Sequence, residues 1–588
     1  MNVPTVKTHL AIAITTAISV ACLTGCGTTG SDKSSDETEV TVNPPSKPST
    51  QQLAQTSAKE RLQDRSKVKN NAIMKIEKKH APGVQYLRPT MAIARESVEL
   101  DRENYAHIEE NTIHQVGDTP VSTFSIDVDT GSYTNVRRIL NQGNLPRADA
   151  VRAEEFINYF NYDYEAPDDD TTPFAIHSEM MASPWSEDSY LLQLGIKAWE
   201  PPHQQRPDAN LVFLVDVSGS MNSADKLGLL KKSLALLTRK LSTKDRISIV
   251  VYAGASGVVL EPVAGNQTAK IELAMQRLQA GGSTNGAAGI KLAYQMAEQS
   301  FIKGGINRIL LATDGDFNVG TTNFDALIDL VEEKRKSGIA LSTLGFGSGN
   351  YNDHLMEQLA DKGNGQYSYI DSLLEARKVL VDEMNSSLLT VAGDVKIQLE
   401  FNPNVVTEYR LIGYENRALA REDFNNDKVD AGEIGAGHTV TALYEVRFTD
   451  SNNKSIDPLR YQSQRKQSEK KASDENNLTS ELGFLKLRYK KPGEDKSQLI
   501  KKVLQKKQLI AQAKQPSDEI KFAASVAAFA QQLGGGKYLG DFGYQQITEL
   551  AQNSKGKDPR GIRGEFLQLV SLAELLSQQS VSTNTGGE

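Results

Sequence analysis

Apolar segments alternate with amphipathic segments along residues 206–385, and this alternation constrains the fold more than any other feature of the sequence. The runs LVFLV (211–215) and ILLA (309–312) are apolar throughout, which predicts strands buried on both faces. The segment 223–241, which follows the first run, carries leucines at helical spacing. The leucines expected to face the core are Leu227, Leu230, Leu234, Leu237 and Leu241. The alternation predicts a doubly wound α/β domain with a parallel central sheet, in which ligands bind beyond the carboxyl ends of the strands.

The segments on either side of this domain have other patterns. Residues 100–205 combine alternating, strand-like stretches with a helical stretch at 147–164, which predicts an α+β N-terminal module. Residues 386–580 contain strand-like stretches first and helical stretches last, which predicts a C-terminal module that is β-rich and then helical. A polar, low-complexity insert at 451–480 interrupts this module, and we expect a long loop there.

The first 25 residues have the pattern of a secretory signal peptide. An apolar stretch, His9–Leu23, follows a weakly basic start and is too short for a comfortable transmembrane helix. The stretch ends in LTGC (Leu23–Cys26), which resembles the bacterial lipobox. That resemblance implies cleavage before Cys26 and attachment of lipid to this cysteine. A plain signal peptide with a chance cysteine is the alternative.

Residues 26–99 link this anchor to the rest of the chain. They are rich in Ser, Thr, Pro and Gln and then in charged residues, which predicts a disordered, charged tether. By resemblance to lipoprotein sorting, Gly27 in place of Asp after the cysteine implies the outer membrane. We therefore expect a lipid-anchored protein of the cell envelope, on the periplasmic face or at the cell surface.

The composition argues against several classes of protein. The 588 residues are 39% hydrophobic and 24% charged, and the formal net charge of −8 argues against a general nucleic-acid binder, which would carry a basic face. No apolar run of about 18 residues follows the N-terminal stretch, so we expect no membrane span in the processed chain. The two cysteines are Cys22 and Cys26, so we expect no disulfide, cysteine nucleophile or cysteine metal site in the folded body.

Three oxygen-bearing side chains follow the first buried strand at alternate positions. Asp216, Ser218 and Ser220 lie where the strand ends and the chain turns into the next helix. Carboxylate and hydroxyl oxygens are hard ligands, which suit Mg²⁺ or Mn²⁺ better than zinc. Thr284, in the Gly-rich loop AGGSTNGA, and Asp314, at the end of another apolar strand, are expected at the same edge of the sheet. The alternative for the first three is a helix cap, since Ser and Asp are favoured at N-caps.

A D-x-S-x-S motif, a threonine in a Gly-rich loop and T-D-G at a strand end occur here in that order. Together they resemble the metal-ion-dependent adhesion site of von Willebrand factor type A domains, which implies a Rossmann-like fold for the central domain. The resemblance also implies that Ser218, Ser220 and Thr284 contact the metal. Asp216 and Asp314 would hold it mostly through water, and an Asp or Glu carboxylate of a partner protein would take the remaining position.

The resemblance extends beyond the central domain to a group of bacterial lipoproteins, the YfbK family. Three segments carry it: FSIDVDTGSYTNVRR (124–138), AVRAEEFINYFNYDY (150–164) and DKVDAGEIGAGHTVTALYEV (427–446). They resemble modules that precede and follow the A domain in that family. The resemblance covers residues from about 100 to about 570 and implies an architecture, but it does not identify a binding partner.

The sequence leaves three functions open. We expect a metal-dependent, adhesion-type binding module that is not an enzyme, because two acids placed mostly in the outer shell leave the ion open to a partner's carboxylate. The alternatives are a Mg²⁺- or Mn²⁺-dependent hydrolase and an envelope scaffold in which the metal site is dispensable. A hydrolase needs a nucleophile or base, for which Asp316 is the one spare acid of the motif, and no lysine clamp is apparent nearby.

Three further motifs resemble other sites. DVDTGS (127–132) matches half of an aspartic-protease signature, and although a symmetric dimer would supply a second half, we expect a helix cap at Asp129 or Thr130. DFNNDKVD (423–430) begins like a calcium loop but lacks the EF-hand glycine and glutamate, so a polar hairpin is expected and a weak Ca²⁺ site is the alternative. LGGGKYLG (533–540) lacks the P-loop pattern and predicts a helix end followed by a turn.

Overall fold

The computed structural model describes residues 102–169, 171–201, 206–282, 286–315, 324–457 and 480–585. All of them belong to one compact unit, Glu96–Glu588. The predictions for the signal peptide, Cys26, the tether, Thr284 and most of the 451–480 insert fall on residues outside the described ranges. Among the helices of the described residues, none has the length and apolarity needed to cross a membrane.

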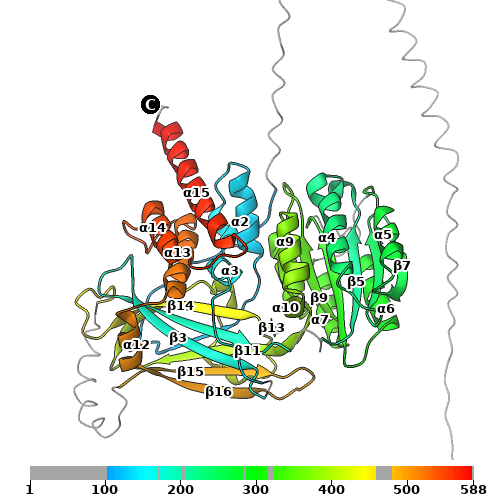
Figure 1. Ribbon diagram of the computed structural model, residues 1–588. Coiled ribbons are helices and arrows are strands. Elements are labelled where there is room, and N and C mark those ends of the chain that lie inside the picture. The colour runs from blue at the N-terminus through cyan, green and yellow to red at the C-terminus, as the bar shows by residue number, and fades with distance from the viewer. Residues whose placement is uncertain are drawn as a thin grey trace, which may run out of the picture. The chain divides into compact units, whose positions relative to one another are not determined.

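The central domain is built on a six-stranded sheet with the order β10-β9-β8-β5-β6-β7 (Figure 1). The first five strands of this order run parallel, and β7 pairs antiparallel with β6 at one edge. The strands are β5 (Ala209–Asp216), β6 (Arg246–Tyr252), β7 (Ser256–Ala264), β8 (Ile306–Thr313), β9 (Ala340–Gly345) and β10 (Tyr367–Tyr369). All residues of β5 and β8 are buried, as a sheet covered on both faces requires. The predicted doubly wound fold is confirmed, with an antiparallel edge strand added.

Helices cover both faces of this sheet. Phe213 of β5 lies in one core with α4 and α5, and the next residue, Leu214, lies in the opposite core with α6, α7 and α8. The helices are α4 (Leu229–Thr238), α5 (Thr268–Gln276), α6 (Gly286–Gln299), α7 (Phe324–Arg335) and α8 (Asp353–Lys362). The short α9 (Leu373–Arg377) and α10 (Met384–Leu388) contribute to the first core and lead out of the domain. The five leucines predicted to face inward are all buried.

Residues on either side of the central domain form two further sheets. One has the order β1-β12-β14-β4-β3, and the other has the order β13-β11-β15-β16, with β2 also paired to β11. The strands that precede the central domain are β1 (His114–Gln115), β2 (Val121–Ser125), β3 (Phe174–Ala182) and β4 (Tyr190–Ala198). Those that follow it are β11 (Thr390–Phe401), β12 (Val406–Ile412), β13 (Gly432–Gly435), β14 (Thr439–Phe448), β15 (Glu481–Lys490) and β16 (Gln498–Gln505). The segments predicted as separate modules therefore share both sheets, since β14 pairs with β4 and β11 pairs with β2.

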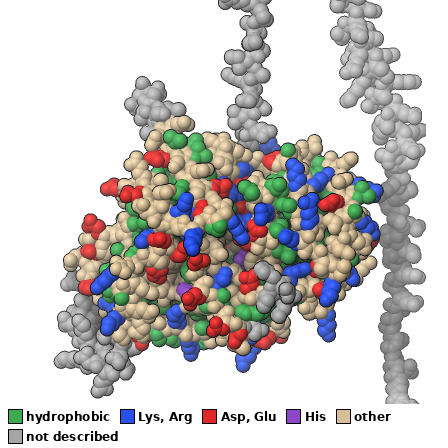
Figure 2. Space-filling model, viewed as in Figure 1, with side chains coloured by type: hydrophobic (Ala, Val, Ile, Leu, Met, Phe, Trp, Pro, Cys, Tyr) green, Lys and Arg blue, Asp and Glu red, His purple; other side chains and the backbone are tan. Residues whose placement is uncertain are grey.

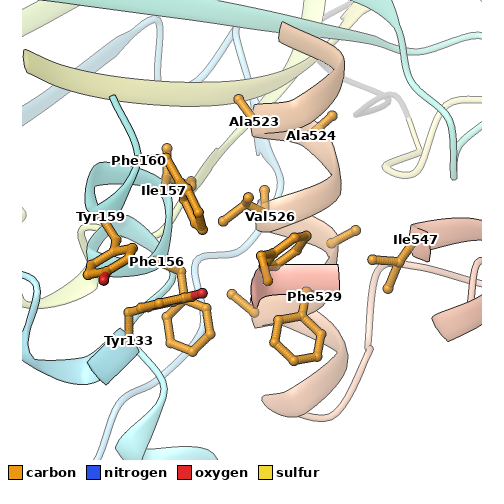
Figure 3. Close-up of a cluster of buried hydrophobic side chains, with 14 of the residues drawn as sticks. Tyr133, Phe156, Ile157, Tyr159, Phe160, Ala523, Ala524, Val526, Phe529 and Ile547 are labelled. Carbon is orange, nitrogen blue, oxygen red and sulfur yellow. The ribbon is translucent and has the colours of Figure 1, made fainter. Parts of the chain in front are cut away.

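One core lies between these two sheets, and another lies under a layer of helices. Tyr444 and Val446 of β14 belong to the core between the sheets, whereas Leu443 belongs to the helical core. The helices are α2 (Gly131–Asn141), α3 (Ala153–Tyr159), α12 (Lys506–Ala513), α13 (Asp518–Leu533), α14 (Tyr544–Ser554) and α15 (Ile562–Thr585). Figure 3 shows aromatic side chains of α2 and α3 beside Val526 and Phe529 of α13. Helices that precede the central domain and helices that follow it thus share one core.

The DVDTGS motif has a structural role. Thr130 occupies the N-cap position of α2, as predicted, but no side-chain hydrogen bond caps this helix. The Asp129 carboxylate instead accepts a hydrogen bond from the backbone N–H of Tyr367 at 2.8 Å and lies 3.4 Å from Arg417. Asp127 lies 3.0 Å from the same arginine. The motif therefore joins two acids to one cation from a distant part of the chain.

The DFNNDKVD loop directs its oxygens toward cationic side chains of the protein. Lys396 Nζ donates to the carbonyl oxygens of Asp423 and Asn426, at 3.2 and 2.7 Å. The Asp427 carboxylate accepts from Arg488 at 3.1 Å and from Ser497 at 2.6 Å. These contacts account for the loop as a structural turn and leave the Ca²⁺ alternative without support.

The LGGGKYLG segment ends a helix, as predicted. Helix α13 ends at Leu533, and the backbone N–H of Gly536 donates to the carbonyl oxygen of Gln531 at 2.8 Å. Gly535 and Gly536 have positive φ angles of 119° and 68°, which favour glycine. The three glycines therefore close the helix instead of holding a phosphate.

Charged side chains of both signs lie on the face of the molecule drawn in Figure 2. On the face drawn in Figure 2, Lys and Arg side chains are interspersed with Asp and Glu side chains. This mixture agrees with the formal net charge of −8 over the whole chain.

Candidate metal centre

Two acids lie at the carboxyl ends of neighbouring strands. Asp216 is the last residue of β5, and Asp314 directly follows Thr313, the last residue of β8. The two strands are parallel and adjacent, with Val215 opposite Ala312, so the ends of both strands lie at one edge of the sheet. Both carboxylates are fully buried. The structure thus brings together two of the predicted metal ligands.

Asp216 is held by hydrogen bonds from the turn that follows β5 and from the end of the neighbouring β8. Its Oδ1 accepts from the backbone N–H of Ser218 at 2.8 Å, and its Oδ2 accepts from the Thr313 hydroxyl at 2.8 Å. Burial is the largest influence on its pKa and raises it to about 6, and the nearby Asp314 adds to this rise, while the hydrogen bonds from Ser218 and Thr313 lower it. A cation near Asp216 would favour its ionised form.

The two serines of the motif lie side by side in the turn after β5. Ser218 Oγ and Ser220 Oγ are 2.9 Å apart, so the two hydroxyls form one polar group beside Asp216. The buried Met221 ends a short helical turn, Gly219–Met221, and anchors this loop in the core. The structure therefore also brings together these two predicted ligands.

The Gly-rich loop that contains the fifth predicted ligand bonds to the same turn. The backbone N–H of Gly219 donates to the carbonyl oxygen of Gly282 at 3.1 Å, and that of Gly281 donates to Val217 at 2.8 Å. Thr284 itself lies outside the described residues, so its role as a ligand stays a prediction.

A lysine that the sequence analysis overlooked lies beside Asp314. Lys226 Nζ is 2.9 Å from Asp314 Oδ2 and 3.0 Å from Asn350 Oδ1. Lys226 belongs to a π-type turn, Ala224–Gly228, that precedes α4, and it is buried. The expectation that no lysine lies near the motif is therefore wrong. The sequence gives no sign of this contact, because the periodicity of residues 223–241 does not show the turn that redirects the Lys226 side chain.

The oxygen atoms at the ends of β5 and β8 suit a hard divalent cation. Two carboxylates and two hydroxyls surround one end of the sheet, and all are oxygen ligands of the kind that Mg²⁺ and Mn²⁺ prefer. The Lys226 ammonium already places a positive charge against Asp314. No cluster of three or more His, Cys, Asp or Glu side chains suited to a metal occurs within the described ranges, and the predicted centre has two acids and takes its other oxygens from hydroxyls.

A doubly wound sheet with D-x-S-x-S after β5 and T-D-G after the adjacent β8 defines a von Willebrand factor type A domain. The family model described as "von Willebrand factor type A domain" matches residues 210–383. A model described as "von Willebrand factor" matches residues 99–193, and one described as "Uncharacterized protein YfbK, C-terminal" matches residues 386–576.

The chain is 48% identical over 476 residues to a protein of Escherichia coli (strain K12) named "Uncharacterized protein YfbK", covering 80% of this chain and 81% of the relative. The chain therefore belongs to the YfbK family of von Willebrand factor type A domain proteins. A protein of Synechocystis named "Uncharacterized protein sll0103" is 30% identical over 185 residues, which are 32% of this chain and 43% of that protein. A solved structure titled "von Willebrand factor type A from Catenulispora acidiphila" is 14% identical, with a TM-score of 0.37 over 70% of this chain and 98% of that chain.

Proposed function

We propose that this protein is a metal-dependent, adhesion-type binding module that presents Mg²⁺ or Mn²⁺ to an acidic group of a partner protein. Domains of the von Willebrand factor A class commonly act as metal-dependent interaction modules, and the chain contains such a domain. The observation that carries the proposal is the convergence of Asp216, Ser218, Ser220 and Asp314 at the ends of β5 and β8.

The roles of the residues follow from their chemistry. Ser218 and Ser220 offer hydroxyl oxygens that would contact the ion, with Thr284 proposed as a third hydroxyl ligand. Asp216 and Asp314 would supply most of the compensating charge, through water. The bound ion would offer a coordination position that an Asp or Glu carboxylate of the partner completes. Because Mg²⁺ loses water reluctantly, this contact is expected to be reversible.

We propose a place in the cell envelope on the basis of the sequence alone. Lipid on Cys26 would anchor the chain, preferentially in the outer membrane, and residues 26–99 would act as the tether. The folded body would then face the periplasm or the cell surface, within reach of other envelope proteins.

The proposed role is binding without catalysis. Metal-assisted phosphoryl transfer needs a nucleophile or base beside the ion. The described acids of the centre are Asp216, which accepts two hydrogen bonds, and Asp314, which pairs with Lys226. Turnover of a panel of phosphoesters with Mg²⁺ or Mn²⁺ by the parent protein, lost on Asp216→Ala, would favour the hydrolase instead.

Metal-dependent capture of a partner tests the proposal. The purified protein is immobilised and exposed to solubilised envelope proteins, with Mg²⁺ or with EDTA, and each captured protein is then purified and tested again alone. We expect capture that requires both Mg²⁺ and an intact Asp216, with Asp216→Asn as a variant that keeps the side-chain volume and one acceptor oxygen. Equal capture by folded Asp216→Ala protein in Mg²⁺ would contradict the proposal.

A further inference from the structure

Lys226 occupies an unusual place for a lysine of an amphipathic helix. Its ammonium lies inside the metal centre, 2.9 Å from the fully buried Asp314 carboxylate. Lys232, on the neighbouring α4, is exposed, as helix lysines usually are. Burial of a lysine is costly unless the charge is paired, and Asp314 and Asn350 provide the pairing here.

The surrounding backbone leaves room for this side chain. Gly347, between β9 and α8, has a φ of +76°, and a Cβ atom at this position would lie 2.2 Å from Lys226 Cε. The carbonyl of Gly347 accepts a hydrogen bond from the Tyr369 hydroxyl, which fixes the glycine in place. The lysine stem therefore passes through a slot that only a glycine leaves open.

The turn that carries Lys226 departs from regular helix geometry. Lys226 has φ −106° and ψ −105°, which interrupts the helical conformation just before α4. Such a break in the helical conformation changes the direction in which a single side chain leaves the backbone. Here the turn directs Lys226 into the metal centre, whereas the next residue, Leu227, is buried in the apolar core.

The second partner of Lys226 lies on a loop that the start of the described chain supports. Asn350 belongs to the loop between β9 and α8. The backbone N–H of the neighbouring Gly349 donates to Glu103 Oε1 at 2.9 Å, and its carbonyl accepts from Arg102 at 3.0 Å. The lysine thus connects Asp314 with a loop that is bonded to residues directly following the predicted tether.

We propose that Lys226 is an internal counterion that competes with the divalent ion for Asp314. The inference rests on the proposed function, because it concerns the regulation of the same centre. A buried ammonium and a divalent ion beside one carboxylate repel each other in a medium of low dielectric constant. Metal binding therefore requires Lys226 Nζ to leave Asp314 and Asn350, which lowers the apparent metal affinity and couples it to the β9–α8 loop.

Removal of the lysine charge tests the competition. Mg²⁺ is titrated calorimetrically into the whole chain, purified in detergent, and into its Lys226→Met and Lys232→Met variants. We expect Lys226→Met to bind Mg²⁺ about tenfold more tightly or better, since the ion no longer displaces a paired charge. Lys232→Met, which removes an exposed lysine of α4, should bind as the parent does.

A labelling experiment on the parent protein remains decisive if Lys226→Met fails to fold. Acetylation of Lys226, followed by mass spectrometry, should be slow in EDTA and become several-fold faster as Mg²⁺ saturates the site, while Lys232 reacts equally fast in both conditions. Two results would overturn the proposed competition and leave the proposed function standing. One is metal binding by the parent with an unchanged rate of Lys226 labelling. The other is a Mg²⁺ affinity of folded Lys226→Met that equals or falls below that of the parent. Absence of metal binding by the parent and the variant, even with an added acidic peptide, would overturn the proposed function as well.

Discussion

At the scale of single residues, Glu357 of α8 is a carboxyl that folding removes almost fully from water. Its Oε1 accepts hydrogen bonds from Asn416 at 2.5 Å and from Arg417 at 3.4 Å, and its Oε2 lies 3.8 Å from Arg152. Burial is the largest influence on its pKa and raises it to about 7, although both arginines lower it. A group of this kind makes folding depend on pH.

The raised pKa of Glu357 predicts a loss of stability as the pH rises. The folded protein holds the proton up to about pH 7, whereas the unfolded chain releases it near the ordinary value of 4.5. The stabilisation is therefore complete below pH 4.5 and is lost as the pH passes 7, by up to about 3 kcal/mol. Urea unfolding between pH 4.5 and 8 should show that Glu357→Gln gains stability relative to the parent across this window. Parallel stability curves for parent, Glu357→Gln and the exposed control Glu333→Gln would contradict this prediction.

The residues of the metal centre differ in how far the sequence predicts them. Asp216, Ser218, Ser220 and Asp314 follow apolar runs, so their place at strand ends could be predicted from the pattern alone. Lys226 could not, because its position depends on a π-type turn and on the open slot above a glycine of another loop. Local periodicity carries no information about such a contact.

At the scale of secondary-structure elements, buried arginines connect the central domain to the flanking sheets. Arg417 follows β12, and its guanidinium lies 3.0 Å from Asp127, 3.4 Å from Asp129 and 2.5 Å from Asp361 of α8. Arg152, before α3, likewise pairs with Asp353 of α8 at 2.5 Å. Arg152 precedes the central domain and Arg417 follows it, and each pairs with acids of α8 as well as with acids that precede the domain, so these pairs position α8.

Removal of Arg417 should destabilise the whole unit. Arg417→Met leaves the buried Asp127 and Asp129 without their cation, which we expect to lower the free energy of unfolding by about 3–5 kcal/mol. Urea unfolding followed by circular dichroism measures this effect. The matched control is Arg421→Met, because Arg421 lies on the same connection and is exposed. Equal stability of the two variants would show that the pairs do not hold the elements together.

In the central sheet, the strands buried along their whole length were predicted, and two strands at the edges, β7 and β10, were missed. The strands β5 and β8 are buried along their whole length, and they appear in the sequence as apolar runs. Strand β7 carries Pro262 and has mixed exposure, which is tolerated at an edge strand but masks the strand pattern. Strand β10 has three residues, too few for any period to appear.

At the scale of the whole molecule, the von Willebrand factor A domain lies in sequence between two segments, and the strands of these two segments pair with each other. Strand β14 lies between β12 and β4, and β2 pairs with β11, so neither segment completes a sheet alone. The sequence predicted most of the longer strands of both segments and the helical end, but not that strands of the two segments would pair with each other. Periodicity shows which face of a strand is buried, whereas the choice of partner depends on contacts far apart in the chain.

The candidate metal centre lies within the central domain and is connected to the start of the described chain. Acids at the strand ends, the serine turn and the Lys226 side chain all belong to the central domain, while the loop behind Lys226 is bonded to Arg102 and Glu103. A metal ion that moves Lys226 would therefore act on a contact between the central domain and the start of the described chain.

Calorimetric titration of Mg²⁺ and Mn²⁺ into a protein comprising residues 82–588, which includes the compact unit from Glu96, tests the central claim most directly. The account predicts binding of one ion by the parent, loss of binding in folded Asp216→Ala and Thr284→Ala variants, and tighter binding when acetate or an acidic peptide is added. Unchanged binding in folded Asp216→Ala protein, or no binding by the parent even with the acidic peptide, would contradict it.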